Sequence, residues 1–330
     1  MSEPQPVNIW TLTDLTTPWC IHVVATLHIA EHIAAGKTAI ADLAQAANCD
    51  AYALGRVLTH LVGKGLFEEP APGHFALNEA VQVLLDPGTH IGLDLDGIGG
   101  RMAHAWGTLL TYVRTGKSGY SQVFGLPFWE DLDAHPDVAA SFDAMIGPAG
   151  HGTPNVNFDI TGGWDSIQTV TDVGGGTGAM LAEILRAHPH LRGTLLDQPR
   201  TVARSGDIFQ AAGVTERVTT VGQSFFDPLP PGADLYILKG ILNDFPDHEA
   251  GAILRRCAEA ARLRERGRVL VLGGVFQDDA PRDLTIEMVL LGGKYRTISE
   301  FRELAHSSGL EVIAAEKQPS GHFAVECRPT

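Results

Sequence analysis

The stretch 169–178, which reads T-V-T-D-V-G-G-G-T-G, constrains the fold more than any other part of this chain. Its β-branched residues favour a strand as far as Val173, and the glycines that follow end that strand before A-M-L-A-E-I-L-R-A begins with helical periodicity. Glycines at a strand–turn–helix junction permit positive φ and let a ligand approach the backbone, while N–H groups at the helix start are free to donate. The stretch therefore predicts a site for a small polar ligand.

The sequence of this loop is compatible with two kinds of ligand, a dinucleotide and S-adenosylmethionine. Gly174, Gly176 and Ala179 fit the dinucleotide pattern G-x-G-x-x-G/A, and Asp197 follows about 20 residues later, as that pattern asks. Asp172 favours another ligand, because a carboxylate there repels phosphates and suits a cation. S-adenosylmethionine has an ammonium, a sulfonium and a ribose but no phosphate, and Asp197 is placed to accept from the ribose hydroxyls. The loop alone favours the methyl donor and leaves the dinucleotide as the alternative.

Strand and helix patterns alternate after the glycine loop. Further strands are expected near 192–197, 217–222, 233–238, 268–274, 310–316 and 321–327. This alternation predicts an α/β fold with a doubly wound, mostly parallel sheet that binds its ligand at the carboxyl ends of the strands. Because the last two strands are close in sequence, we expect one of them to run antiparallel at the edge.

The N-terminal region predicts a helical unit that contacts a second subunit. Residues 8–35 are apolar on most sides, which is typical of a helix buried partly against a partner. His28 and His32 share one face at the i,i+4 spacing of a metal clamp, but no third ligand stands at a useful spacing, so no metal is expected. Residues 38–77 read as helix, turn, helix and two short strands, the pattern of a winged helix.

A winged helix raises the alternative of a DNA-binding regulator that senses a small molecule. The charge argues against it: the chain has 24 Lys and Arg against 39 Asp and Glu, a net charge of −15, and the second helix of the motif carries only Arg56 and Lys64. Nucleic acid and anionic membranes are therefore not expected as partners. Four scattered cysteines and the lack of an apolar leader or span predict a reduced, cytoplasmic protein.

The region 77–160 is expected to be mostly helical and to supply a substrate pocket. Trp106 and Met145 are candidates for its lining, although aromatic and Met residues at helical spacing are more often core. The segment 147–157 breaks the helical pattern with glycines and prolines, and His151 is its one titratable candidate.

Four motifs in order carry a family resemblance: D-V-G-G-G-T-G, L-L-D-Q-P, S-F-F-D-P-L-P and L-K-G-I-L-N-D-F-P-D-H-E-A. With the N-terminal winged helix, the chain resembles the S-adenosylmethionine-dependent small-molecule O-methyltransferases. It is most similar to the bacterial branch that acts on aromatic polyketides, including anthracycline 4-O-methyltransferases and naphthoate O-methyltransferases. The resemblance implies a homodimer with a winged-helix dimerisation domain (1–85), a helical pocket segment (86–160) and a seven-stranded class I methyltransferase domain (161–330).

The resemblance also implies the roles of individual residues. The methionine part of the donor falls to Asp172, Gly174 and Gly176, and the ribose to Asp197. Adenine contacts fall to Ser224 and Phe225, and Lys239 opens the last motif. Asn243 joins Trp106 and Met145, the candidates from the helical region, as an expected substrate contact.

Asn243 is the main departure from the family pattern, because plant-type members keep a catalytic histidine there. The acid that orients this histidine has no clean match, although Asp283 and Glu287 are near the expected position. An amide cannot take a proton, so Asn243 is expected to orient an oxygen, and methyl transfer to proceed by proximity or with a base such as His151. A second departure, Gln223 for a glycine, is expected to crowd or hydrogen-bond the adenine.

The alternative that the missing histidine favours is a non-methylating member of the same fold. Such a hydroxylase, decarboxylase or pericyclic catalyst binds S-adenosylmethionine without consuming it.

Overall fold

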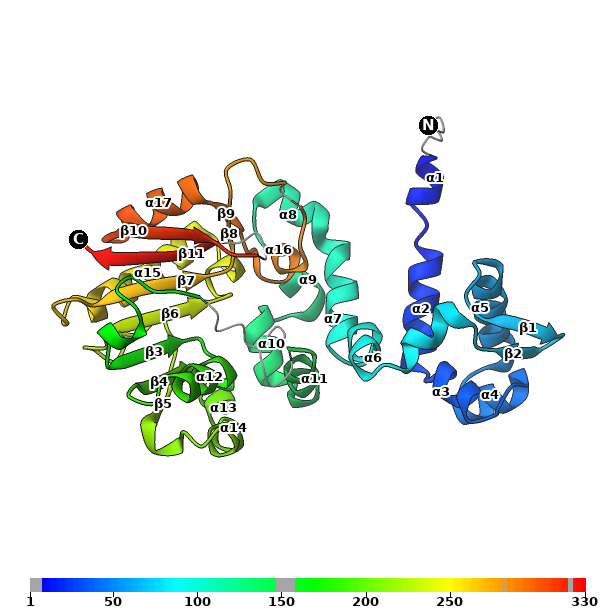
Figure 1. The fold of residues 1–330 in the computed structure, drawn as a ribbon. Helices are drawn as coiled ribbons and strands as arrows, with labels where there is room; N and C mark the ends of the chain where they lie inside the picture. Colours follow the sequence, from blue (N-terminus) through cyan, green and yellow to red (C-terminus); the bar gives the residue numbers. More distant parts are fainter. Residues whose placement is uncertain (1–7, 147–157, 282, 320–322) are drawn as a thin grey trace, which may run out of the picture. The chain divides into compact units, whose positions relative to one another are not determined.

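The computed structural model describes residues 8–146, 158–281, 283–319 and 323–330. Contacts divide the chain into two compact units (Figure 1), one of Met1–His104 with Leu132–Met145 and one of Ala105–Asp131 with Ile146–Thr330. The segment 86–160, expected as one pocket segment, is thus shared between the two units. No helix of the described residues is long and apolar enough to cross a membrane.

The first unit is helical and contains one small hairpin. Its apolar core joins Val24, Ile29, Leu43 and Leu58, which are all fully buried. Asp50 caps the helix α5 (Ala51–Gly63) by accepting from the Ala53 backbone N–H, which fixes the turn that the sequence predicts. The elements are α1 (Ile9–Leu12), α2 (Thr16–Thr26), α3 (Ile29–Ala34), α4 (Ile40–Ala46), α5 (Ala51–Gly63), antiparallel β1 (Glu68–Ala71) and β2 (His74–Ala76), η1 (Glu79–Leu85), α6 (Pro87–Leu93), α7 (Ile98–Ala105) and α11 (Pro136–Ile146).

The second unit is built on a seven-stranded sheet in the order β10-β11-β7-β6-β3-β4-β5. The strands are β3 (Thr169–Val173), β4 (Arg192–Asp197), β5 (Val218–Gly222), β6 (Leu235–Lys239), β7 (Arg268–Leu272), β10 (Leu310–Lys317) and β11 (Phe323–Pro329). The predicted mostly parallel sheet is confirmed. The expectation of an antiparallel edge strand is wrong in one respect: antiparallel β11 lies between β7 and β10, and β10 forms the edge.

Helices cover both faces of this sheet (Figure 1). The strands β3, β6 and β7 are almost entirely buried, and β6 and β7 have the apolar runs expected of strands covered on both sides. One face packs under α15 (Asp247–Ala261) and α17 (Ile298–Ser307), and the other under α12 (Ala179–Ala187) and α14 (Gly206–Ala211). Shorter elements are η3 (Trp164–Ser166), α13 (Pro199–Val202), η4 (Thr215–Arg217), η5 (Leu242–Asp244), and parallel β8 (Val275–Phe276) and β9 (Arg296–Thr297).

A helical segment before the sheet completes the second unit. It holds η2 (Trp106–Thr108), α8 (Leu109–Thr115), α9 (Tyr120–Phe124) and the start of α10 (Phe128–Ala134), and α16 (Ile286–Leu291) packs against its first three elements. The Ser118 hydroxyl contacts the backbone carbonyls of Val289 and Leu290 at 2.6 and 2.8 Å. This segment is therefore anchored to α16, which also contacts η5 at the carboxyl end of β6.

Candidate functional site

The glycine loop joins β3 to α12, as the sequence predicts. Gly174 has φ +71°, and a Cβ there would stand 2.5 Å from Ile241 Cδ1, so a side chain is excluded by both strain and space. The Gly174 N–H donates to the Leu196 carbonyl at 2.8 Å, which joins the loop to the end of β4. Only glycine allows the loop to lie this close to its neighbours.

Asp172 lies beneath this loop with its carboxylate buried. A Cβ on Gly175 would come within 2.5 Å of Asp172 Cγ, which places the carboxyl group directly under the turn. Neither carboxylate oxygen has a hydrogen-bond partner in the described structure, and the residue is fully buried. Burial and the nearby Asp197 raise the pKa of Asp172 to about 7, against the opposing charge of Lys239. An unpaired buried carboxylate of this kind is suited to a cationic ligand.

Asp197 ends β4 and faces the same loop. Its carboxylate accepts from the Gly176 N–H at 2.8 Å and from the Gln198 N–H at 2.7 Å. Burial raises the pKa of Asp197 in spite of these bonds. The Thr201 side chain also hydrogen-bonds this carboxylate, and the bonds together fix its orientation at the loop. The structure thus brings Asp172, Gly174, Gly176 and Asp197 together.

The adenine candidates follow β5. The Phe225 ring makes an edge contact with Phe245, with centroids 5.7 Å apart, and comes 3.5 Å from where a Gly174 Cβ would lie. Phe225 is therefore at the glycine loop. Ser224 is exposed, and its hydroxyl accepts from the Phe226 N–H. Gln223, which stands where the family usually has a glycine, donates from its side-chain amide to the Pro228 carbonyl at 3.0 Å.

Asn243 lies in η5, just beyond the carboxyl end of β6. Lys239 ends β6 half-buried, and burial lowers its pKa. Asn243 is buried, and its Nδ2 donates to Asp244 Oδ1 at 3.2 Å. The guanidinium of Arg296 donates to the carbonyls of Leu242 and Phe245 at 2.7 and 2.9 Å. The Arg296 side chain consequently holds the turn by its main-chain carbonyls on both sides of Asn243.

Asp244 and Glu287 form an acidic group beside Asn243; the sequence analysis named Glu287 near the family's acidic position but missed Asp244. Burial, followed by the charge of Glu287, raises the pKa of Asp244 to about 8. Glu287 Oε2 is buried and has no hydrogen-bond partner in the described structure. Burial and these two carboxyl groups raise the pKa of Tyr295 to about 12. The signal was present as N-D in L-N-D-F and as Glu287 near the family's acidic position, but only the fold brings α16 against η5.

Comparison with known proteins identifies this arrangement. Residues 106–311 match the O-methyltransferase domain family. The chain belongs to this family. It is 39% identical to 2,7-dihydroxy-5-methyl-1-naphthoate 7-O-methyltransferase of Streptomyces carzinostaticus, over 94% of each chain, and 37% identical to aclacinomycin 10-hydroxylase RdmB of Streptomyces purpurascens, over 93% of this chain and 84% of that one.

A solved structure shows the same fold in this O-methyltransferase family. NcsB1 from neocarzinostatin biosynthesis, in complex with S-adenosylmethionine and 2-hydroxy-5-methyl naphthoic acid, superposes with a TM-score of 0.86 at 37% identity, over 99% of this chain and 100% of that one. The family and the class I methyltransferase sheet expected from the motifs are thereby confirmed.

The residues expected to contact the substrate belong to both units of this chain. Trp106 lies in η2 of the sheet unit with 40% of its surface exposed, and η2 contacts α16 beside the Asn243 turn. Met145 ends the portion of α11 that belongs to the first unit. His151 lies outside the described residues. These three assignments stay predictions.

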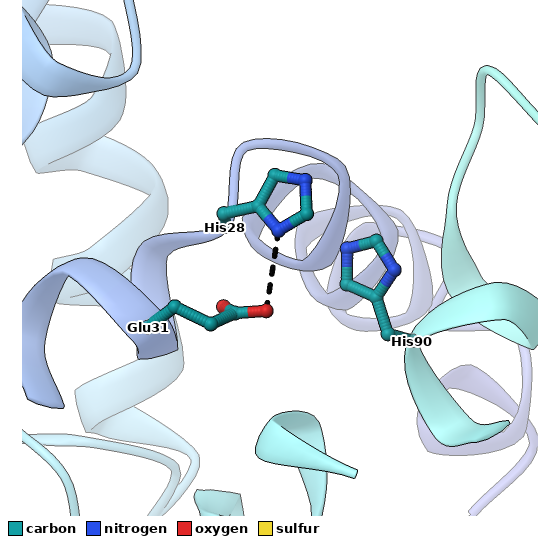
Figure 2. A group of neighbouring side chains, drawn as sticks. All are labelled: His28, Glu31 and His90. Atoms are coloured by element: carbon teal, nitrogen blue, oxygen red, sulfur yellow. Dashed lines mark hydrogen bonds and ion pairs between the residues drawn. The ribbon is translucent and has the colours of Figure 1, made fainter. Parts of the chain in front are cut away.

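The first unit of the O-methyltransferase brings His28 together with Glu31 and His90, rather than with His32 (Figure 2). Their candidate ligand atoms lie within 4.8 Å of one another. Each histidine has another explanation: His28 Nδ1 pairs with Glu31 at 3.2 Å, His90 Nε2 bonds the Ala25 carbonyl at 3.0 Å, and the two rings stack at 4.3 Å. These contacts give each of the three side chains a partner within the protein.

Proposed function

We propose that the protein transfers a methyl group from S-adenosylmethionine to a hydroxyl of an aromatic, polyketide-type natural product. The observation that carries this function is the buried Asp172 carboxylate, which has two unpaired oxygens under a glycine loop. Such a group fits the ammonium of the donor and opposes the phosphates of a dinucleotide. The relatives named above, a naphthoate 7-O-methyltransferase and NcsB1 with its bound naphthoic acid, support an aromatic acceptor.

Each residue of the site has a role in holding the donor. Asp172 pairs with the ammonium, and the backbone at Gly174 and Gly176 leaves room for the methionine part. Asp197, fixed by two backbone N–H groups, accepts from the ribose hydroxyls. Phe225 stacks on the adenine, and exposed Ser224 is a polar contact at its edge. S-adenosylmethionine supplies the electrophilic methyl group.

Catalysis rests first on alignment. Asn243 is held in a buried turn and hydrogen-bonds the acceptor oxygen, while Trp106, from the same unit, contacts the substrate. Holding two reactants in line contributes about 7–11 kcal/mol in well-oriented systems, because the entropy of bringing them together has already been lost on binding. This contribution does not need Asn243 to move a proton.

The test of the function is the fate of the donor. Incubation with methyl-labelled S-adenosylmethionine and a panel of hydroxylated naphthoates and anthraquinones should give labelled product and one equivalent of S-adenosylhomocysteine per turnover. Binding of the donor without label transfer to any phenol of the panel would reject methyl transfer.

A second candidate function is a non-methylating reaction that keeps the donor intact. Two observations favour it: Asn243 stands where a basic side chain is usual, and a 37% identical relative is named a 10-hydroxylase. In that case an anthracycline-type substrate is converted while the amount of S-adenosylmethionine stays constant. Quantifying donor and product in the same reaction separates the two functions.

We also propose that the protein is a cytoplasmic homodimer that pairs through its N-terminal unit. Ile9, Trp10, Leu12 and Leu15 are between 66% and 81% exposed, and an apolar groove begins at Leu15. Water-exposed apolar side chains in such number are typical of an interface. Light scattering should give a dimer for the native chain and a monomer for Trp10→Glu. A matched substitution on the other unit, Leu263→Glu, should leave the dimer intact.

A further inference from the structure

The Asn243 turn is adjacent to the donor loop through one packing contact. Ile241 lies against Gly174, where a Cβ would be only 2.5 Å from Ile241 Cδ1. Ile241 is the N-cap of η5. Asn243 and Asp244, in that turn, therefore come two and three residues after the residue that touches the glycine loop. A group that moves a proton during methyl transfer belongs beside this loop, because the acceptor oxygen must reach the donor methyl.

Asp244 is the titratable group closest in the chain to Asn243 and is bonded to it. Asp244 Oδ1 accepts from Asn243 Nδ2 at 3.2 Å, which fixes both side chains in one orientation. Gly293 also lies against this pair, since a Cβ there would stand 2.3 Å from the Asn243 carbonyl. The carboxyl group is therefore placed by the turn itself.

Glu287 provides the second carboxyl group from α16, which contacts η5. Its Oε2 is buried with no partner among the described residues. The other groups around the turn do not neutralise these acids: Lys294 and Arg296 both pair with Asp247, at 2.8 and 2.9 Å, and Tyr295 is a neutral phenol. Two carboxyl groups thus share a site in which the basic side chains have another partner.

We propose that Asp244, held beside Glu287, is the general base that takes the proton of the acceptor hydroxyl during methyl transfer. The inference rests on the methyl-transfer function proposed above. As the acceptor oxygen bonds to the donor methyl, the methyl–sulfur bond breaks, its electron pair stays on sulfur, and the hydroxyl proton passes to a carboxylate oxygen of Asp244. The products are the methyl ether, S-adenosylhomocysteine and the Asp244 carboxylic acid.

The environment gives this carboxylate the basicity that the reaction needs. An ordinary aspartate is too weak a base for a phenol, but burial and the neighbouring Glu287 charge raise the pKa of Asp244 to about 8. Asp244 is consequently ionised and able to accept a proton as the pH rises through about 8. A base near the working pH contributes about 10²- to 10⁴-fold to the rate.

The decisive experiment compares Asp244→Asn, Glu287→Gln and the control Asp283→Asn in single-turnover reactions from pH 6 to 10. Asp283 is exposed on the same segment as Glu287, so the control removes a nearby carboxylate outside the site. Two acceptors are used, a weakly acidic phenol and one already ionised at pH 6. S-adenosylhomocysteine affinity, measured by calorimetry, reports whether each variant is folded.

We expect the native rate with the weakly acidic phenol to rise through about pH 8. Asp244→Asn should lose this rise and slow the reaction at least 100-fold with that phenol, but less than 5-fold with the ionised acceptor. Glu287→Gln removes the like charge, so its rise should move to lower pH. This second variant keeps the test valid if Asp244→Asn fails to fold. Asp283→Asn should match the native profile.

Two outcomes overturn the inference, and they are distinguishable. If native protein forms S-adenosylhomocysteine and neither Asp244→Asn nor Glu287→Gln changes the pH profile, Asp244 is not the base although methyl transfer stands. If native protein binds S-adenosylhomocysteine but makes none of it with either acceptor, the methyl-transfer function fails and the inference fails with it.

Discussion

The substitution Asp172→Asn is expected to change two quantities in opposite directions: the unfolding free energy of the protein and its affinity for the methyl donor. The pKa of Asp172 rises from the ordinary 3.8 to about 7 on folding. At 1.36 kcal/mol for each tenfold change in acidity, this corresponds to about 4 kcal/mol. Because the folded state holds the proton more tightly, the unfolded state ionises first, and the unfolding free energy of the ligand-free protein falls as pH rises from about 4 to 7.

An asparagine at this position keeps the shape and does not titrate. We therefore expect Asp172→Asn to unfold like the native protein near pH 4 and to be more stable at pH 8, by up to about 4 kcal/mol. Binding changes in the opposite direction, because the donor ammonium loses its carboxylate partner. Removing one member of a buried charge pair costs about 2–5 kcal/mol, which is a 30-fold or greater loss of S-adenosylmethionine affinity.

The assay combines urea unfolding at pH 4.5 and 8 with calorimetry on two ligands. S-adenosylhomocysteine has the amino-acid ammonium, whereas 5′-methylthioadenosine lacks it. Asp172→Asn should weaken only the first, and Asp197→Asn should weaken both because Asp197 is assigned to the ribose. Equal losses for both ligands in Asp172→Asn, or a less stable variant at pH 8, would refute the reasoning.

Three further predictions concern other parts of the structure. Gly174→Ala should lower the unfolding free energy by about 1–3 kcal/mol in urea and weaken donor binding, because φ is +71° and Ile241 occupies the space of the new methyl. Arg296→Lys should reduce kcat while S-adenosylhomocysteine affinity in calorimetry stays within about threefold, because one ammonium cannot replace a fork that bonds two carbonyls of the Asn243 turn. Zinc titration should show no stoichiometric binding, with His28→Ala identical to native, because His28, Glu31 and His90 each have a partner within the protein.

The glycine loop and its acidic neighbours could be predicted from sequence because their pattern is local. The β-branched run before Gly174 encodes β3, and the apolar period after it encodes α12. Asp197 is found from the same logic, since it ends the next strand of a parallel sheet whose carboxyl ends meet at one edge. The sequence pattern predicts that these strands exist. It does not predict that β11 lies between β7 and β10, because strand order depends on packing between distant segments.

The acidic pair at the Asn243 turn shows where sequence reasoning ends. Asp244 and Glu287 are far apart in sequence, and their proximity depends on α16 packing against η5. The family pattern points near Glu287, but neither residue type is unusual for a surface, and no local pattern marks either side chain as buried. Likewise, spacing pairs His28 with His32, whereas the folded chain stacks the His28 ring on His90. Tertiary contacts decide both cases.

The hold of Arg296 on the Asn243 turn has a consequence for how this enzyme changes over evolution. The Arg296 guanidinium bonds the main-chain carbonyls of Leu242 and Phe245, so these bonds do not depend on which side chain stands at 243. Gly274 leaves the space next to Asn243 without a side chain. Position 243 can therefore exchange one functional group for another while the backbone stays in place, which makes this turn a point where a new reaction can arise in an unchanged fold.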